Sequence, residues 1–362
     1  MNFFAGPFIG EFGWELCYWH GWLRKIKKNY LKNEKLIVSS FPGRQPLYEF
    51  ADEFISLPKF YLDKNFTQRG YFIDLDRDYE KKEYKIQSQK LLEYYTTLFK
   101  GENVLQINNF PQKKYTRNLF LRTLKKLKKN FFTKSIATDE DLNSYLKYCN
   151  HHPGINIPNP LFLNYPKNDN KYIPQTPTND DQLWTSLKPT NDGKKYREQF
   201  LENYDRNKDI FTLFPRKRND RRPDKNWSKD NWMQFIDLLI KEYDCLIVIC
   251  GTREGAYFHE LENNSNILNL INVQKDLHLD LQLAFIDISK IAIHGRSGSC
   301  NLSMQNGCPT FMAGPEHDRH RICVYDNPMN SKINYYTEYG VNPSPKSFFN
   351  EFKKYFNHLY GN

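Results

Sequence analysis

Six cations in one loop of the second half of the chain form its clearest anion-binding feature. The loop runs from residue 215 to 225 and follows an apolar segment, Ile210 to Phe214, that we expect to be a strand. Its cations are Arg216, Lys217, Arg218, Arg221, Arg222 and Lys225. Together they can compensate the charge of a diphosphate. A charge run can also be a solvated surface loop, but its position after a strand favours binding.

Two later loops also have residue types suited to a nucleotide. Glu254 follows the apolar run Cys245 to Cys250 and can accept hydrogen bonds from ribose hydroxyls, although it can equally be a surface residue. The loop 294–301 combines glycines and serines, which let backbone amides approach a phosphate, with an arginine that can add a bidentate contact. The residues expected at this site are Arg216, Arg218, Lys225, Glu254, Arg296, Ser297, Gly298 and Ser299.

A parallel sheet is needed to position such loops, because ligands bind beyond the carboxyl ends of parallel strands. Apolar segments alternate with helix-compatible segments in both halves of the chain. Strands are expected at 3–9, 35–40, 210–214, 245–250 and 291–294, with helices at 14–29, from 44 through 54, and at 229–243, the last capped by Ser228. The alternation predicts an α/β protein with two Rossmann-like, doubly wound domains.

The domain boundary is expected where regular patterns disappear. Residues 151–191 are dense in Pro, Asn, Asp and Thr, which predicts connecting loops. We therefore expect an N-terminal domain over 1–195 and a C-terminal nucleotide-binding domain over 206–345. The aromatic segment 346–362 is expected to be a helix that packs back across the junction.

Composition limits the classes of protein. A chain of 362 residues fits two domains, and 39% hydrophobic residues exclude a disordered chain. The apolar runs are too short to span a bilayer and no basic region precedes an apolar one at the N-terminus, so we expect a cytoplasmic protein. Seven Cys without a CxxC pair argue against a disulfide framework or a zinc site.

The net charge of +10 favours an anionic partner. Residues 113–129 contain eight cations and no acids, with apolar residues at helical spacing. A basic amphipathic helix here can lie on anionic lipid, follow a nucleic-acid backbone, or only solubilise a surface. Asp74-Leu75-Asp76-Arg77-Asp78 has the form of a metal-binding motif, but it lies in the half without nucleotide loops, and no metal is expected.

The motif order from Phe211 to Glu316 resembles the heptosyltransferase-like glycosyltransferases, the ADP-heptose:lipopolysaccharide family and its relatives. The matching segments are Lys225-Asn226-Trp227 with Trp232, Cys250-Gly251 with Glu254, Ile267 to Leu270, Ser297-Gly298, Asn306 to Pro309, and Gly314-Pro315. The resemblance implies the GT-B fold, in which two Rossmann-like domains face a central cleft. It also implies Lys225 near the phosphates, Glu254 at the ribose, and Ser297-Gly298 at the donor sugar and phosphates.

This chain departs from the family pattern at two positions. Arg296 stands where the family usually has an acidic residue, and Asn301 stands where a His is common. The identity of the donor sugar therefore does not follow from the resemblance.

By the same resemblance, Glu11 in the first glycine turn corresponds to the family's general base. A carboxylate at the tip of the first strand can remove the acceptor hydroxyl proton during attack on the anomeric carbon. Glu15 and His20 are competing candidates, and Glu11 can instead cap its own helix. The residues expected on the acceptor side are Gly10, Gly13, Glu15, His20 and Arg44.

These features predict a glycosyltransferase that is inverting, independent of metal, and without a cofactor other than its nucleotide-sugar co-substrate. The expected acceptor is a glycan or lipopolysaccharide-type saccharide. The alternatives are a hydroxymethylated base in DNA, of the kind that phage glycosyltransferases modify, and a non-catalytic relative that binds a nucleotide or glycan.

Overall fold

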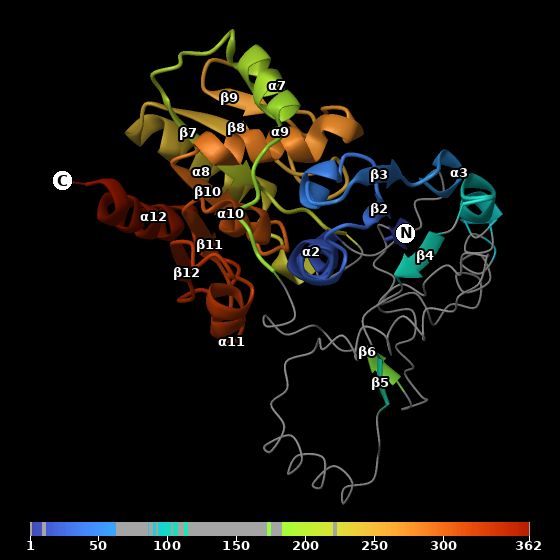
Figure 1. Cartoon of the computed structure of the whole chain (residues 1–362). Helices are drawn as coiled ribbons and strands as arrows, with labels where there is room; N and C mark the ends of the chain where they lie inside the picture. The colour runs from blue at the N-terminus through green and yellow to red at the C-terminus, as the bar shows by residue number, and fades with distance from the viewer. Residues whose placement is uncertain are drawn as a thin grey trace, which may run out of the picture. The chain divides into compact units, whose positions relative to one another are not determined.

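The computed structural model describes residues 2–8, 12–62, 86, 90–91, 93–102, 104–107, 112–114, 172–174, 183–219 and 223–361 (Figure 1). The chain divides into two compact units after Leu183. Each unit contains a parallel sheet, so the α/β class with Rossmann-like sheets is confirmed. None of the helices in the described ranges is long and apolar enough to cross a membrane.

The C-terminal unit is built on six parallel strands. They are β7 (Asp209–Phe214), β8 (Cys245–Ile249), β9 (Ile267–Asn269), β10 (Ile291–His294), β11 (Thr310–Ala313) and β12 (Ile333–Tyr336). Their order in the sheet is β12-β11-β10-β7-β8-β9. The chain thus adds strands outward from β7 on one side and then returns to add β10 on the other, which is the order of a doubly wound dinucleotide-binding fold.

Helices cover both faces of this sheet, which explains why its central strands are apolar throughout. Phe211 and Phe311 point to the face covered by α8 (Lys229–Glu242) and α12 (Pro345–Tyr360). Met312, the next residue along β11, points to the other face, where it packs with α10 (Cys300–Asn306). The predicted cap of α8 is confirmed, because the Asn231 amide donates to Ser228 Oγ at 3.1 Å.

Aromatic rings from α12 form the centre of the C-terminal core. Phe352 is fully buried, with its ring centroid 5.4 Å from that of Phe311 and 5.9 Å from those of Phe211 and Phe235. The last helix is therefore an integral part of the C-terminal unit. Its expected contact across the junction remains a prediction.

The segment before β7 belongs to the C-terminal unit, upstream of the expected boundary at residue 195. Thr190 caps α7 (Asn191–Leu201), and its amide donates to Asp280 Oδ1 at 2.8 Å. Gly193 lies so close to the same carboxylate that a Cβ there would be 2.5 Å from Asp280 Cγ. Asp280 belongs to α9 (Lys275–Ile288), so it binds the two helices together.

The N-terminal unit repeats the start of this topology with four parallel strands. They are β1 (Asn2–Ala5), β2 (Lys35–Ser40), β3 (Glu53–Ser56) and β4 (Val104–Ile107), in the order β3-β2-β1-β4. The helix expected from 44 through 54 is wrong, because only the 3-10 turn η2 (Gln45–Tyr48) forms before β3. Gly6 has φ 133°, and a Cβ there would be 2.6 Å from the Ser39 carbonyl oxygen, so glycine is required after β1.

Six further elements of this unit have described bounds. They are α1 (Phe12–Trp14), the π-helical turn η1 (Glu15–Trp19), α2 (His20–Tyr30), α3 (Lys59–Leu62), and the antiparallel pair β5 (Gln112–Lys114) and β6 (Tyr172–Pro174). Several predicted features fall outside the described residues: Gly10, Glu11, Asp74 to Asp78, most of 113–129, Arg221, Arg222, and most of 151–191.

Replacing Phe352 with Ala tests the aromatic core. The variant should lose about 3–5 kcal/mol of unfolding free energy, because it removes a fully buried ring from a close-packed cluster. Urea unfolding of the full chain measures this loss. Lys353→Ala is the matched control on the same helix, because Lys353 is exposed and pairs only with Glu242 among the described residues. Equal stability of the two variants would contradict the assigned packing.

Candidate functional site

The candidate site lies where β7 and β10 end side by side. Phe214 is paired in register with His294, and the Gly295 amide donates to the Phe214 carbonyl at 3.0 Å. A Cβ on Gly295 would be 2.8 Å from Arg216 Cβ, so this glycine allows the two loops to touch. In a doubly wound sheet this is the position at which the strand order reverses and where ligands bind.

The basic loop after β7 is held in shape by one side chain, Asn226. Its Oδ1 accepts hydrogen bonds from the Arg218 amide at 3.0 Å and from the Arg216 guanidinium, and its Nδ2 donates to the Arg218 carbonyl at 2.7 Å. The backbone also joins this loop to the loop after β8, because the Lys217 amide donates to the Gly255 carbonyl at 2.9 Å. The structure therefore brings the first and second predicted loops together.

Arg216 is a buried cation among other cations. Only 7% of its surface is exposed. Its pKa is lowered to about 10, mainly by burial and with the nearby charges of Arg218 and Arg296 acting in the same direction, against the opposing charge of Asp224. A depressed pKa means that the charged form is destabilised relative to water. A bound anion would relieve this electrostatic cost.

A carboxylate that was not among the predicted site residues, Asp318, lies between the predicted donor-binding cations. Asp318 Oδ2 is 2.7 Å from Arg296 Nη2 and 3.5 Å from Lys225 Nζ, and its Oδ1 is 3.5 Å from Arg321 Nη2. Burial alone would raise the pKa of Asp318, but the charges of Arg296, Lys225 and Arg321 outweigh it and lower that pKa to about 2. Asp318 is in α11 (Glu316–His320), directly after the predicted Gly314-Pro315 turn.

The Arg296 side chain is enclosed by its surroundings. A Cβ on Gly314 would be 3.2 Å from Arg296 Cδ and 2.0 Å from the Tyr335 hydroxyl oxygen, so only glycine leaves room for both side chains. Six per cent of the Arg296 side chain is exposed. Arg296 of the third loop and Lys225 therefore face the same oxygen of Asp318. A donor-binding role for these two cations remains a prediction.

The serines of the third loop bond to one another and to the end of β10. Ser297 Oγ and Ser299 Oγ are 2.6 Å apart, and His294 Nε2 is 2.7 Å from Ser303 Oγ in α10. Burial lowers the pKa of His294 to about 3, so the ring is neutral, and it stacks on Phe214 with the centroids 4.2 Å apart. These contacts fix the backbone around Gly298. A role for Ser297, Gly298 and Ser299 toward a ligand remains a prediction.

Glu254 is exposed in the turn after β8. The turn is closed by the Gly255 amide, which donates to the Thr252 carbonyl at 3.0 Å. The loop also contains Phe258, a buried residue with φ 77°, a conformation that costs a bulky residue energy and indicates a backbone fixed by its surroundings. The expected ribose contact of Glu254 remains a prediction.

In the N-terminal unit, the structure brings together two of the residues predicted on the acceptor side. Glu15 is fully buried and accepts hydrogen bonds from Tyr48 Oη at 2.5 Å, from Arg44 Nη1 at 3.1 Å and from Ser40 Oγ. The Arg44 guanidinium also lies 3.9 Å above the Phe12 ring. Glu15 therefore has a structural contact pattern: three donors surround its carboxylate, and these hydrogen bonds connect η1 to the end of β2 and to the turn that follows. We call this network the buried anchor.

Two other predicted acceptor-side residues lie near this anchor in the sequence. Gly13 is within α1. His20 is fully buried, and its Nε2 donates to the Leu16 carbonyl at 2.9 Å in the preceding turn. A role toward an acceptor remains a prediction for both Gly13 and His20.

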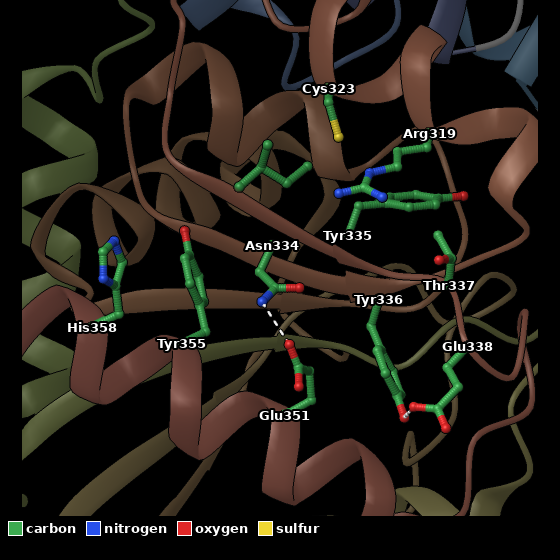
Figure 2. A pocket seen from close by; sticks show the side chains of 11 residues that line it. Arg319, Cys323, Asn334, Tyr335, Tyr336, Thr337, Glu338, Glu351, Tyr355 and His358 are labelled. Atoms are coloured by element: carbon green, nitrogen blue, oxygen red, sulfur yellow. Dashed lines mark hydrogen bonds between the residues drawn. The ribbon is translucent and has the colours of Figure 1, made fainter.

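A cavity of about 520 Å³ lies elsewhere in the C-terminal unit, beside the edge strand β12 (Figure 2). Residues of β12, α12, α11 and the following π-helical turn η6 (Arg321–Tyr325) line it, and none of the predicted donor-binding residues is among them. Its polar side chains partly pair with each other, as Asn334 with Glu351 at 3.2 Å and Tyr336 with Glu338 at 2.8 Å. The cavity borders the candidate site at Tyr335, which lines the cavity and also lies against Gly314 beside Arg296.

Glu15→Gln tests the buried anchor. The variant should lose about 3 kcal/mol of unfolding free energy. The amide leaves Arg44 without its counter-charge, and its NH2 group, which can only donate, faces side chains that also donate. Thermal and urea unfolding of the full chain measure this loss. Glu53→Gln is the control, since it removes a carboxylate from an exposed pair with Lys35. A Glu15→Gln protein as stable as the control would show that the network contributes little.

The sequence matches no family model and no curated protein. Similar solved structures include E. coli ADP-heptose lps heptosyltransferase II, with 14% identity, a TM-score of 0.48, and coverage of 99% of this chain and 98% of that one. E. coli heptosyltransferase WaaC with ADP has 12% identity, a TM-score of 0.47, and coverage of 99% and 100%. A family 9 glycosyl transferase from Veillonella parvula has 9% identity, a TM-score of 0.47, and coverage of 93% and 85%. Heptosyltransferases, which the motif order indicates, are therefore among the structures to which this chain is similar.

Proposed function

We propose that this chain is a glycosyltransferase that moves a sugar from a nucleotide-sugar donor to an acceptor hydroxyl. The observation that carries the proposal is the convergence of Arg216, Lys225 and Arg296 at the adjacent carboxyl ends of β7 and β10. A doubly wound sheet binds nucleotides at this place. Buried cations there favour a diphosphate over a neutral ligand.

In the proposed reaction, the cations stabilise the charge that develops on the leaving group. The acceptor oxygen forms a bond to the anomeric carbon while the bond from that carbon to the diphosphate oxygen breaks, and the configuration inverts. The nucleoside diphosphate leaves with the electron pair, and fixed positive charges stabilise it more in the transition state than in the intact donor. Arg216, Arg296 and Lys225 can fill this role without a metal ion.

Glu11 is proposed as the general base that takes the proton of the acceptor hydroxyl. Glu11 lies outside the described residues, so its role rests on its place in the sequence, between β1, which ends at Ala5, and α1, which begins at Phe12. The N-terminal sheet has the order β3-β2-β1-β4, so the order of its strands reverses between β1 and β4, as it does between β7 and β10 in the other unit. Ligands bind at the carboxyl ends of strands at such a reversal, and we propose that Glu11 acts on the acceptor there.

The proposed acceptor is a glycan or lipopolysaccharide-type saccharide. A hydroxymethylated base in DNA is the second candidate, and the net charge of +10 favours it because duplex DNA attracts basic proteins. A mass-spectrometric screen that crosses nucleotide sugars with glycan and hydroxymethylated DNA acceptors distinguishes the two. Nucleotide binding without transfer to any acceptor would support a non-catalytic relative instead.

Arg216→Gln should weaken the binding of nucleoside diphosphates by about tenfold or more, because it removes a charge-assisted contact from a buried site. Isothermal titration calorimetry with ADP, UDP and GDP measures the change. Arg319→Gln is the matched control, because Arg319 is exposed and pairs with Glu316 on the outside of α11. Equal affinities of the two variants would remove Arg216 from the donor site.

Glu11→Gln should slow transfer by about 10²–10⁴-fold and leave the affinity for the nucleoside diphosphate unchanged, because a general base acts on the acceptor proton and not on the donor. Single-turnover kinetics with the best donor from the screen measure the rate. Unchanged turnover would exclude Glu11 as the base, and the same measurement on Glu15→Gln would then test the competing candidate.

A further inference from the structure

We infer that the Asp318 carboxylate occupies the subsite of a donor phosphoryl group, and that Arg296, Lys225 and Arg321 bind this group once Asp318 has moved away. Asp318 is then an internal counter-ion that competes with the donor. The inference rests on the proposed function, because it assigns the site to a nucleotide sugar. It also adds Arg321, which the sequence did not single out, to the phosphoryl-binding residues.

The positions of the charges carry the first step. The same oxygen, Asp318 Oδ2, faces both Arg296 at 2.7 Å and Lys225 at 3.5 Å, while the other oxygen faces Arg321 at 3.5 Å. A phosphoryl group also presents several oxygens to cations from different directions. The carboxylate therefore stands in for two oxygens of such a group, at the point where cations from three separate segments meet.

The fit between Asp318 and Arg296 is incomplete, which favours a larger anion. Within the described residues, Nε of Arg296 is buried and has no hydrogen-bond partner, whereas Nη2 faces Asp318 Oδ2 at 2.7 Å. Buried guanidinium donors without acceptors are costly. A phosphoryl group offers one more oxygen than a carboxylate and can satisfy both donors.

Arg296 does not depend on Asp318 for its position. Gly314 and Tyr335 enclose its side chain, and this enclosure persists when the carboxylate leaves. Arg321 also keeps a partner, because its Nη1 is 3.2 Å from Asp326 Oδ2. Arg296 and Arg321 thus stay in place without Asp318, which distinguishes a counter-ion from a residue that positions them.

The helix that carries Asp318 can move at small cost. The helix α11 has five residues, none of them buried. Its other side chains, such as His317, Glu316 and Arg319, are mostly exposed. Displacing these five residues therefore uncovers little apolar surface, whereas the following turn η6 is held by the buried Ile322, so the exchange is governed mainly by charge.

Asp318→Asn is the direct test, with inorganic pyrophosphate and a nucleoside diphosphate as the probes. Calorimetry should give a Kd for pyrophosphate that is about tenfold lower than in the unmodified chain, because a like charge no longer competes for the cations. Glu316→Gln, the same change of charge on the outside of the same helix, should leave the Kd unchanged. An Asp318→Asn protein with equal or weaker affinity would overturn the inference and leave the proposed function standing. Failure of every variant and of the unmodified chain to bind either probe would overturn both.

Hydrogen exchange on the unmodified chain tests the same inference if Asp318→Asn does not fold. Pyrophosphate should accelerate amide exchange in residues 316–320, because Asp318 releases the cations and α11 moves away. Slower exchange in this segment would show that Asp318 stays in place and positions the cations, and would overturn the inference.

Discussion

The parallel pairing of β7 between β8 and β10 is the constraint on which the rest of the C-terminal unit depends. The strand is buried on both faces, so its side chains belong to two different layers of helices. Because the chain adds strands to one side of β7 before it returns to the other, the loops after β7 and β10 meet at one place. The aromatic packing below the sheet and the cluster of cations at its edge both follow from that order.

The charged groups around Glu15 and those around Asp318 differ in how fully their charges are compensated within the fold. Glu15 is surrounded by three donors and fully buried, so its charge is compensated within the fold. The cations near Asp318 are different, because Arg216 and Arg296 repel each other and one carboxylate faces three positive groups. A fold tolerates such an excess of like charge when a ligand of opposite charge completes the site.

The strands β1, β2, β7, β8 and β10 could be predicted because their signals are local, whereas β3, β4, β9, β11 and β12 were not predicted. Apolar runs such as Cys245 to Cys250 and the Ser228 cap are read within a few residues of the chain. The helix predicted after Arg44 is wrong because the apolar residues of the short turn η2 and the strand β3, taken together, are as frequent as those of a single helix. Asn226 and Asp318 could not be assigned their contacts, because these join residues up to tens of positions apart and depend on packing between loops. Only the Gly314-Pro315 turn after a strand pointed toward Asp318.

The edge strand β12 has a consequence for the solubility of the protein. Among the described strands, β12 pairs only with β11, so its other edge presents unpaired backbone groups that can recruit a strand from another molecule. The strand has four residues, and the cavity beside it is lined by Arg319, Glu338 and Glu351. An incoming strand would have to desolvate these charges. The charged side chains that line this cavity therefore also disfavour pairing of another strand with the free edge of β12.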